Sequence, residues 1–232
     1  MCVGRVQLIA MIGLLVVATG PGGAKGFDGK TFVAEQCTSC HDVTGPAPTT
    51  YEDILSRKAP DLFYAGSKFN RPWLVAWLQR PTAIRRAGVM FLNHVADEGG
   101  KDRIVEEFVK PCTANLSPAQ AETVANHLMT LKDSAMKTGV VEIGKKLRKH
   151  KAYRLFTKQL PCIGCHRIKF GKREMGGVSG PDLTGAGDRL NPDWIYARIE
   201  NPQYWDPKTW MPRIAMSHRK REMLTLFVSS MK

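Results

Sequence analysis

Two short motifs in this chain of 232 residues combine side chains that can do chemistry. They are Cys37-Thr38-Ser39-Cys40-His41 and Cys162-Ile163-Gly164-Cys165-His166. On a helical turn, this spacing places two thiols on one side with an imidazole beside them. Such thiols can form thioethers with the two vinyl groups of a porphyrin, and the histidine can bind the iron. The motifs therefore predict two covalently bound haem c groups. The alternative is a zinc-binding or redox Cys-x-x-Cys pair followed by an unrelated histidine. In the haem interpretation, the attachment residues are Cys37, Cys40, Cys162 and Cys165, and the proximal iron ligands are His41 and His166.

The two motifs belong to an internal repeat. Pro60-Asp61-Leu62, shifted by 121 positions, falls on Pro181-Asp182-Leu183, and the same shift places Met90 on Met211. Further pairs in this register are Asn70 with Asn191, Trp73 with Trp194 and Pro81 with Pro202. A repeat of this length predicts a duplicated haem domain.

A haem iron with one histidine ligand needs a sixth ligand, or it leaves an open site for a substrate. We expect Met90 and Met211 to be these ligands, because the repeat places them at the same point of each half. A methionine thioether is a soft ligand that fills the site and raises the reduction potential. The nearby alternatives are Met216, His94 and His218. Two filled sites favour electron transfer and disfavour a dihaem peroxidase.

The residues around each motif suggest how the cofactor is oriented. A proximal histidine usually donates its other ring N–H to a carbonyl, which fixes the ring plane. Pro60 and Pro181 are the candidates to present that carbonyl. Trp73 and Trp194 either donate indole hydrogens to haem propionates or pack in the core.

The local signals are helical throughout. Asn70 and Asn191 are suited to cap helices that end before Pro81 and Pro202, and Ser117 begins a capping box. We also expect opening helices over about 28–36 and 141–158, and a closing helix near the end of each half. No alternating strand pattern of any length is present. The sequence therefore predicts an all-α fold.

The N-terminal residues predict export and the remainder predicts two domains. Arg5 precedes an apolar segment and then small residues, the order of a secretory signal peptide. We expect a signal peptide over 1–24, one domain over 25–133, a linker over 134–139 and a second domain over 140–232. The protein would be periplasmic, or membrane-anchored if the apolar segment is not cleaved.

Together these residues resemble those of a dihaem class I cytochrome c. The resemblance rests on the two Cys-x-x-Cys-His motifs, Pro-Asp-Leu, the tryptophan helix, the later methionine and the closing helix. It implies two tandem class I cytochrome c domains, each a small helical bundle around a covalently bound haem. It also implies low-spin haems with one exposed edge and electron transfer between larger redox complexes.

The net charge of +13 is unevenly distributed. Residues 27–133 hold 12 Lys and Arg against 13 Asp and Glu, whereas residues 134–232 hold 20 against 8. Basic side chains near a haem edge speed encounter with an acidic redox partner. We expect the basic second domain to dock such a protein, and export argues against nucleic acid as a partner. Association with a membrane oxidoreductase complex is the other arrangement compatible with the sequence.

Cys112 keeps an enzymatic alternative open. It is the one cysteine after residue 24 that the motifs do not use. Some exported dihaem enzymes that act on small sulfur compounds, similar in layout to this chain, have a cysteine thiolate in place of the methionine. Cys112 as axial ligand of the first haem would give a dihaem oxidoreductase of that kind.

Overall fold

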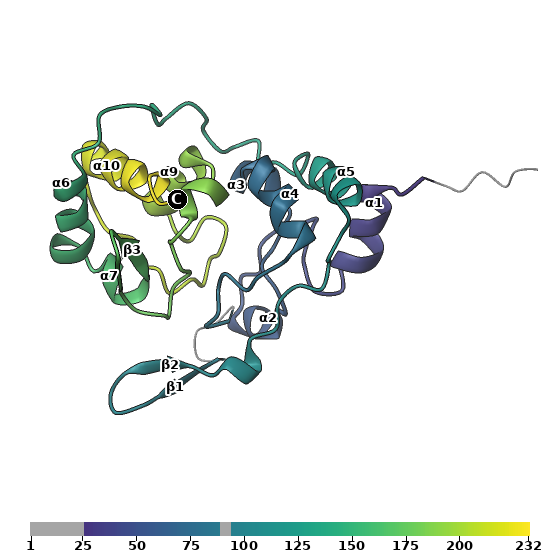
Figure 1. The fold of residues 1–232 in the computed structure, drawn as a ribbon, viewed down its shortest axis with the longest axis horizontal. Helices are drawn as coiled ribbons and strands as arrows, with labels where there is room; N and C mark the ends of the chain where they lie inside the picture. The colour runs from purple at the N-terminus through teal and green to yellow at the C-terminus, as the bar shows by residue number, and fades with distance from the viewer. Residues whose placement is uncertain (1–25, 89–93) are drawn as a thin grey trace, which may run out of the picture.

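The computed structural model describes residues 26–88 and 94–232 (Figure 1). The signal peptide expected over 1–24 and the expected ligand Met90 lie outside the described residues.

The first half of the chain, residues 26–133, combines short helices with one hairpin of strands. Its elements are α1 (Gly29–Phe32), the π-helix η1 (Val33–Cys37), α2 (Tyr51–Ser56), α3 (Ala65–Lys68), α4 (Arg71–Gln79), β1 (Val95–Asp97), β2 (Asp102–Ile104), the 3-10 helix η3 (Glu106–Phe108) and α5 (Pro118–Leu128). The hairpin of β1 and β2 projects away from the helices (Figure 1).

The second half, residues 140–232, repeats much of this order. Its elements are α6 (Lys149–Arg154), the π-helix η4 (Leu155–Gln159), α7 (Cys162–Cys165), β3 (Ile168–Phe170), β4 (Arg173–Met175), α8 (Ala186–Arg189), α9 (Pro192–Glu200) and α10 (His218–Ser229). In both halves a π-helical turn leads directly toward the cysteine motif.

The all-α prediction is wrong. The described residues form ten α-helices and two small antiparallel sheets, and helices account for only 41% of them. Each sheet is a two-stranded hairpin of three-residue strands, closed by a turn with glycine at positive φ: Gly99 and Gly100 in the first, Gly171 in the second. These strands are only three residues long and half of their residues are charged, so their turns define them better than any apolar alternation does. The halves are therefore mixed structures and not purely helical bundles.

The repeat is visible in the element bounds. A shift of 121 residues carries α3 onto α8 and α4 onto α9 without a change of length. The connection from α4 to α5 spans 80–117, whereas that from α9 to α10 spans 201–217, so the first is 21 residues longer (38 against 17). The longer connection contains the β1–β2 hairpin and η3.

Several expected helix ends are present. Ser117 and Gln120 form the reciprocal capping box at the start of α5. The helices α4 and α9 end just before Pro81 and Pro202, because proline cannot continue the backbone ladder. The opening helix of the second half is shorter than predicted. It begins at Lys149, and at the expected start the amides of residues 139–141 bond to the Asp193 carboxylate instead of opening a helix.

Each half packs its closing helix against its opening helix. In the first half α1 crosses α5 so closely that a Cβ on Gly29 would overlap the Thr123 carbonyl. Val33, Leu74 and Val124 are buried in this core. In the second half α6 and α10 enclose Leu155, Phe156 and Phe227. Glycine at a crossing allows the two backbones to approach.

The two halves meet where residues 68–70 run antiparallel to residues 189–191. The amide of the last residue in each segment donates to the carbonyl of the first residue in the other, over 2.9 Å in both cases. Both segments occupy the same position of the repeat. The contact is therefore self-complementary, like the two-fold interface between identical subunits.

Side chains extend this junction. Tyr64 stacks on Trp205 at 5.6 Å and shares one buried cluster with Leu190 and Trp194. Trp205 donates from Nε1 to Asp133 over 2.9 Å. The two halves thus share part of a hydrophobic core.

Among the described residues, none of the helices combines the length and apolar character that crossing a membrane requires.

Candidate functional site

The second motif is held on a short helix that ends at its histidine. Cys162 and Cys165 lie on α7, and His166 is the C-terminal cap. The His166 Nδ1 lies 2.8 Å from the Pro181 carbonyl oxygen. Because a carbonyl only accepts, Nδ1 carries the hydrogen and Nε2 keeps its lone pair. His166 is thus oriented as an iron or zinc ligand needs it to be.

A glycine-rich loop packs against this motif. The amide of Gly177 donates to Ile163 O over 2.9 Å, and that of Gly180 donates to Cys165 O over 2.8 Å. A Cβ on Gly180 would lie 2.8 Å from both Nδ1 and Cε1 of His166. The loop therefore packs directly against the imidazole, and glycine at position 180 leaves room for the ring in this half.

A cavity borders the second motif. Its volume is about 100 Å³, below the ~300–1,000 Å³ typical of cofactor sites, so its walls would have to move apart to admit a cofactor. Cys162, His166 and Met211 all line it, although Met211 lies 45 positions after the histidine. Most of the other walls are apolar, including Phe156, Leu183, Leu190, Ile195, Ile199 and Leu224. One apolar space therefore brings together three of the residues expected to bind the second cofactor.

The first motif has the same local arrangement. Cys37 ends η1, and Cys40 and His41 follow it. The His41 Nδ1 lies 2.6 Å from Pro60 O, so the hydrogen bond expected from the repeat is present in both halves. A polar groove beside this motif is lined by Cys40, His41, Arg57 and Asp61. The ligand Met90 is outside the described residues, so its role stays a prediction.

Burial changes the acid–base properties of the motif residues. It raises the pKa of Cys37 to about 11, with further contributions from Cys112 and Cys40, and it raises that of Cys162. Both thiols thus stay protonated at neutral pH, the opposite of what a reactive Cys-x-x-Cys pair needs. Burial also lowers the pKa values of His41 and His166, which keeps both rings neutral.

The alternative sixth ligands differ in their surroundings. Met216 lines the same cavity as Met211 and remains available there. His218 instead bonds through Nδ1 to the Tyr196 hydroxyl over 2.7 Å. His94 bonds through Nδ1 to the Arg86 carbonyl over 3.0 Å. Cys112 is half-buried. Its thiolate would contribute to the raised pKa of Cys37, which places Cys112 near the first motif.

Sequence reasoning missed a group of cations at the junction. This group, which we call the junction cluster, consists of five side chains: Arg57, Lys68, Arg85, Arg189 and Arg198. Three of them, Arg85, Arg189 and Arg198, lower the pKa of His166. One was detectable in the sequence: Arg198 lies four residues after Trp194, on the same face of the helix. The others look like ordinary surface residues in the sequence.

The chemistry of the second cavity suits a haem. A porphyrin is apolar over its faces and has two carboxylates at one edge. The cavity offers apolar walls, the thiol of Cys162, a neutral imidazole and a thioether, with Arg198 and Trp194 as its polar members. The Trp194 side chain is 8% exposed, and no described residue accepts a hydrogen bond from its Nε1. A buried donor of this kind needs a partner.

Comparison with protein-family models, curated proteins and solved structures gave no significant match. Within residues 26–88 and 94–232, no group of three or more His, Cys, Asp and Glu side chains is placed to hold a metal ion.

Proposed function

We propose that this chain is an exported dihaem cytochrome c that passes single electrons between larger redox complexes. The observation that carries the proposal is the second cavity, where Cys162, His166 and Met211 share apolar walls. The same Cys-x-x-Cys-His motif and histidine–carbonyl bond occur in the first half. The fold in this proposal is the mixed one described above.

A bound haem would supply an iron that alternates between two oxidation states. The chain's own residues would do the rest. Cys162 and Cys165 would attach the cofactor, and His166 would bind through Nε2, held in its plane by Pro181. Met211 would occupy the remaining position and keep out small molecules. The apolar walls would exclude water and so limit reorganisation when charge changes.

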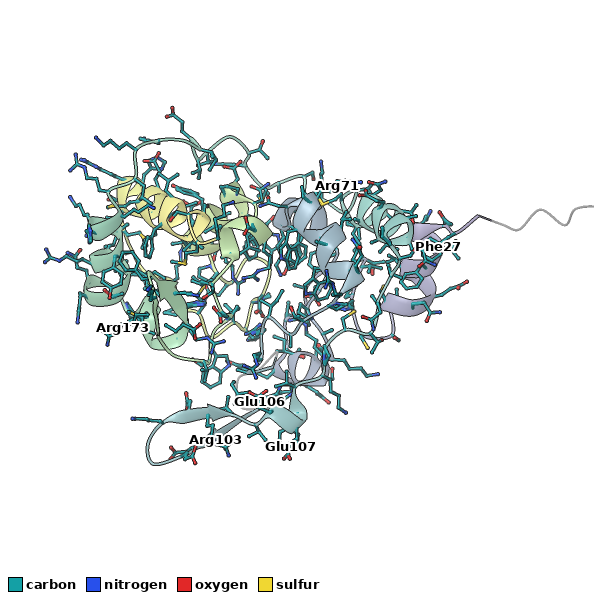
Figure 2. The ribbon with its side chains drawn as sticks, in the orientation of Figure 1. Phe27, Arg71, Arg103, Glu106, Glu107 and Arg173 are labelled. Carbon is teal, nitrogen blue, oxygen red and sulfur yellow. The ribbon has the colours of Figure 1, made fainter. Side chains whose placement is uncertain are left out.

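The surface of the second half supports an acidic partner. Lys169, Lys172 and Arg173 are exposed on the β3–β4 hairpin that follows the motif, and Arg173 lies at the outer edge of this half (Figure 2). Arg167 contributes less, because it pairs with Asp182 at 2.7 Å. Such exposed charges speed the encounter with an acidic protein but add little to the binding affinity.

The test is whether both haem irons already have six ligands in the purified, oxidised protein. If both irons are filled, cyanide and peroxide leave the spectrum unchanged, and each haem takes up one electron reversibly. Met211→Ala should open one haem to cyanide, while Met216→Ala, on the same cavity wall, should not. Ready cyanide binding by the unaltered protein, or turnover of a small substrate, would contradict an electron carrier.

A further inference from the structure

Lys68 is an unusual lysine because it lies inside the junction between the halves. Its Nζ lies 4.9 Å from the ring centre of Phe69, 5.6 Å from that of Tyr64 and 5.2 Å from that of Trp194. Phe69 and Tyr64 belong to the first half, and Trp194 lines the cavity of the second. Lys68 therefore places an amino group of one half beside Trp194, which lines the cavity of the other.

The carboxylates nearby are already shared among other cations. Asp61 pairs with Arg57 at 2.5 Å, and Asp206 lies 3.8 Å from Arg57 and 3.6 Å from Arg198. Asp182 pairs with Arg167 and gives Arg189 only its backbone carbonyl. Among the described residues, none of these carboxylates forms an ion pair with Lys68 or Arg85.

Unpaired polar atoms accompany this excess of positive charge. Arg85 Nε and Trp194 Nε1 are both buried, and neither has a hydrogen-bond partner in the described part of the chain. Buried donors and cations are costly unless an acceptor or an anion balances them. The aromatic rings around Lys68 attract its charge but accept no proper hydrogen bond, so they offset only part of that cost.

We propose that Lys68 and Arg85 of the first half join Arg198 and Trp194 of the second half in a binding site for carboxylate, and that it holds a propionate of the haem in the second cavity. The inference rests on the function proposed above. Its new element is that one half supplies cations to the cofactor of the other. The cofactor would then link the halves and stabilise their junction.

The groups that face Lys68 come from every element packed against it. They are Arg189 of α8, Arg198 of α9, Arg85 of the loop after α4, the carboxylate Asp61, the phenol of Tyr64, and His41 of the first motif. Burial, then Arg189, Arg198 and Arg85, lowers the pKa of Lys68 to about 7. A carboxylate beside the ammonium would raise this pKa, so that Lys68 stays charged at neutral pH.

The test is the reduction potential of the second haem, measured against pH in the full-length holoprotein. The second haem is identified as the one whose spectrum changes when Met211 is replaced. In the unaltered protein a carboxylate held among cations stays ionised, so we expect a potential that is flat between about pH 5 and 8. In Lys68→Met and Arg85→Met the carboxylate pKa rises into this range. The potential should then fall as pH increases, because the ionised carboxylate favours ferric iron.

Two further variants make the outcome decisive. Lys68→Arg keeps the charge and should restore the flat profile, whereas Lys101→Met, in the exposed turn of the β1–β2 hairpin, should change nothing. The inference is overturned if Lys68→Met and Arg85→Met keep flat profiles. It is also overturned if the unaltered protein shows a bend near pH 7 that Lys68→Met abolishes, because Lys68 would then titrate without an anion. Failure of the proposed function would look different, since no covalent haem would be present.

Discussion

Gly180→Ala should disturb the second site by crowding the ring of His166. The new Cβ would lie 2.8 Å from Nδ1 and Cε1 of His166, against ordinary contacts of 3.4–4 Å. The ring or the loop must then move by at least ~0.6 Å, which lengthens the 2.8 Å bond to Pro181 toward its limit. Overpacking costs ~1–3 kcal/mol and a weakened hydrogen bond ~0.5–1.5 kcal/mol. We therefore expect the free energy of unfolding to fall by about 2–4 kcal/mol.

The assay is denaturant unfolding of the holoprotein, followed by circular dichroism and by the haem spectrum of the folded state. Gly164→Ala is the matched control, because a Cβ there meets nothing within 4 Å, and it should be neutral or slightly stabilising. Ala59→Gly tests the corresponding position of the first half and should leave the second haem unchanged. If Gly180→Ala unfolds within ~0.5 kcal/mol of the unaltered protein, with the same spectrum, the reasoning about His166 is refuted.

Three further substitutions test the packing of the second half, the junction and the ligands of the first haem. Gly187→Ala should lower stability by ~1–3 kcal/mol in the same unfolding assay, because its Cβ would overlap the Ser229 carbonyl at the end of α10; stability equal to that of Gly164→Ala would contradict this packing. Asn70→Ala should cost ~1–2 kcal/mol, since Nδ2 donates across the junction to Asp188 O at 3.0 Å and Leu190 O at 3.2 Å; an unchanged unfolding midpoint would show that these bonds contribute nothing. Cys112→Ser should leave both haem spectra unchanged, whereas loss of the ligand signature of the first haem would favour the sulfur oxidoreductase.

Much of the local structure could be predicted because each signal acts over a few residues. Ser117 and Gln120 form the box that their spacing indicated, and Asn191 caps α9 by accepting from Asp193 over 2.9 Å. Asn70, at the same repeat position, makes no such cap. Its amide instead bonds to carbonyls of the other half, a tertiary contact with no local trace.

The hairpins and the junction cluster could not be predicted for a similar reason. Strands such as Asp102–Ile104 are too short and too charged to show an apolar alternation. Lys68 looks like a solvent-exposed lysine in the sequence, and only the antiparallel meeting of two repeat segments covers part of it. The orientation of His41 and His166 was easier to predict, because the repeated Pro-Asp-Leu motif indicated Pro60 and Pro181 as the carbonyl partners.

The most direct measurement for the central claim is the number of covalently bound haems per chain. The full-length protein would be expressed together with a c-type haem maturation system, and haem retained after denaturation would be counted. We predict two per chain, and one when Cys162 and Cys165 are both replaced by alanine. A chain that matures with no covalent haem, or that binds zinc at these cysteines instead, would contradict the account.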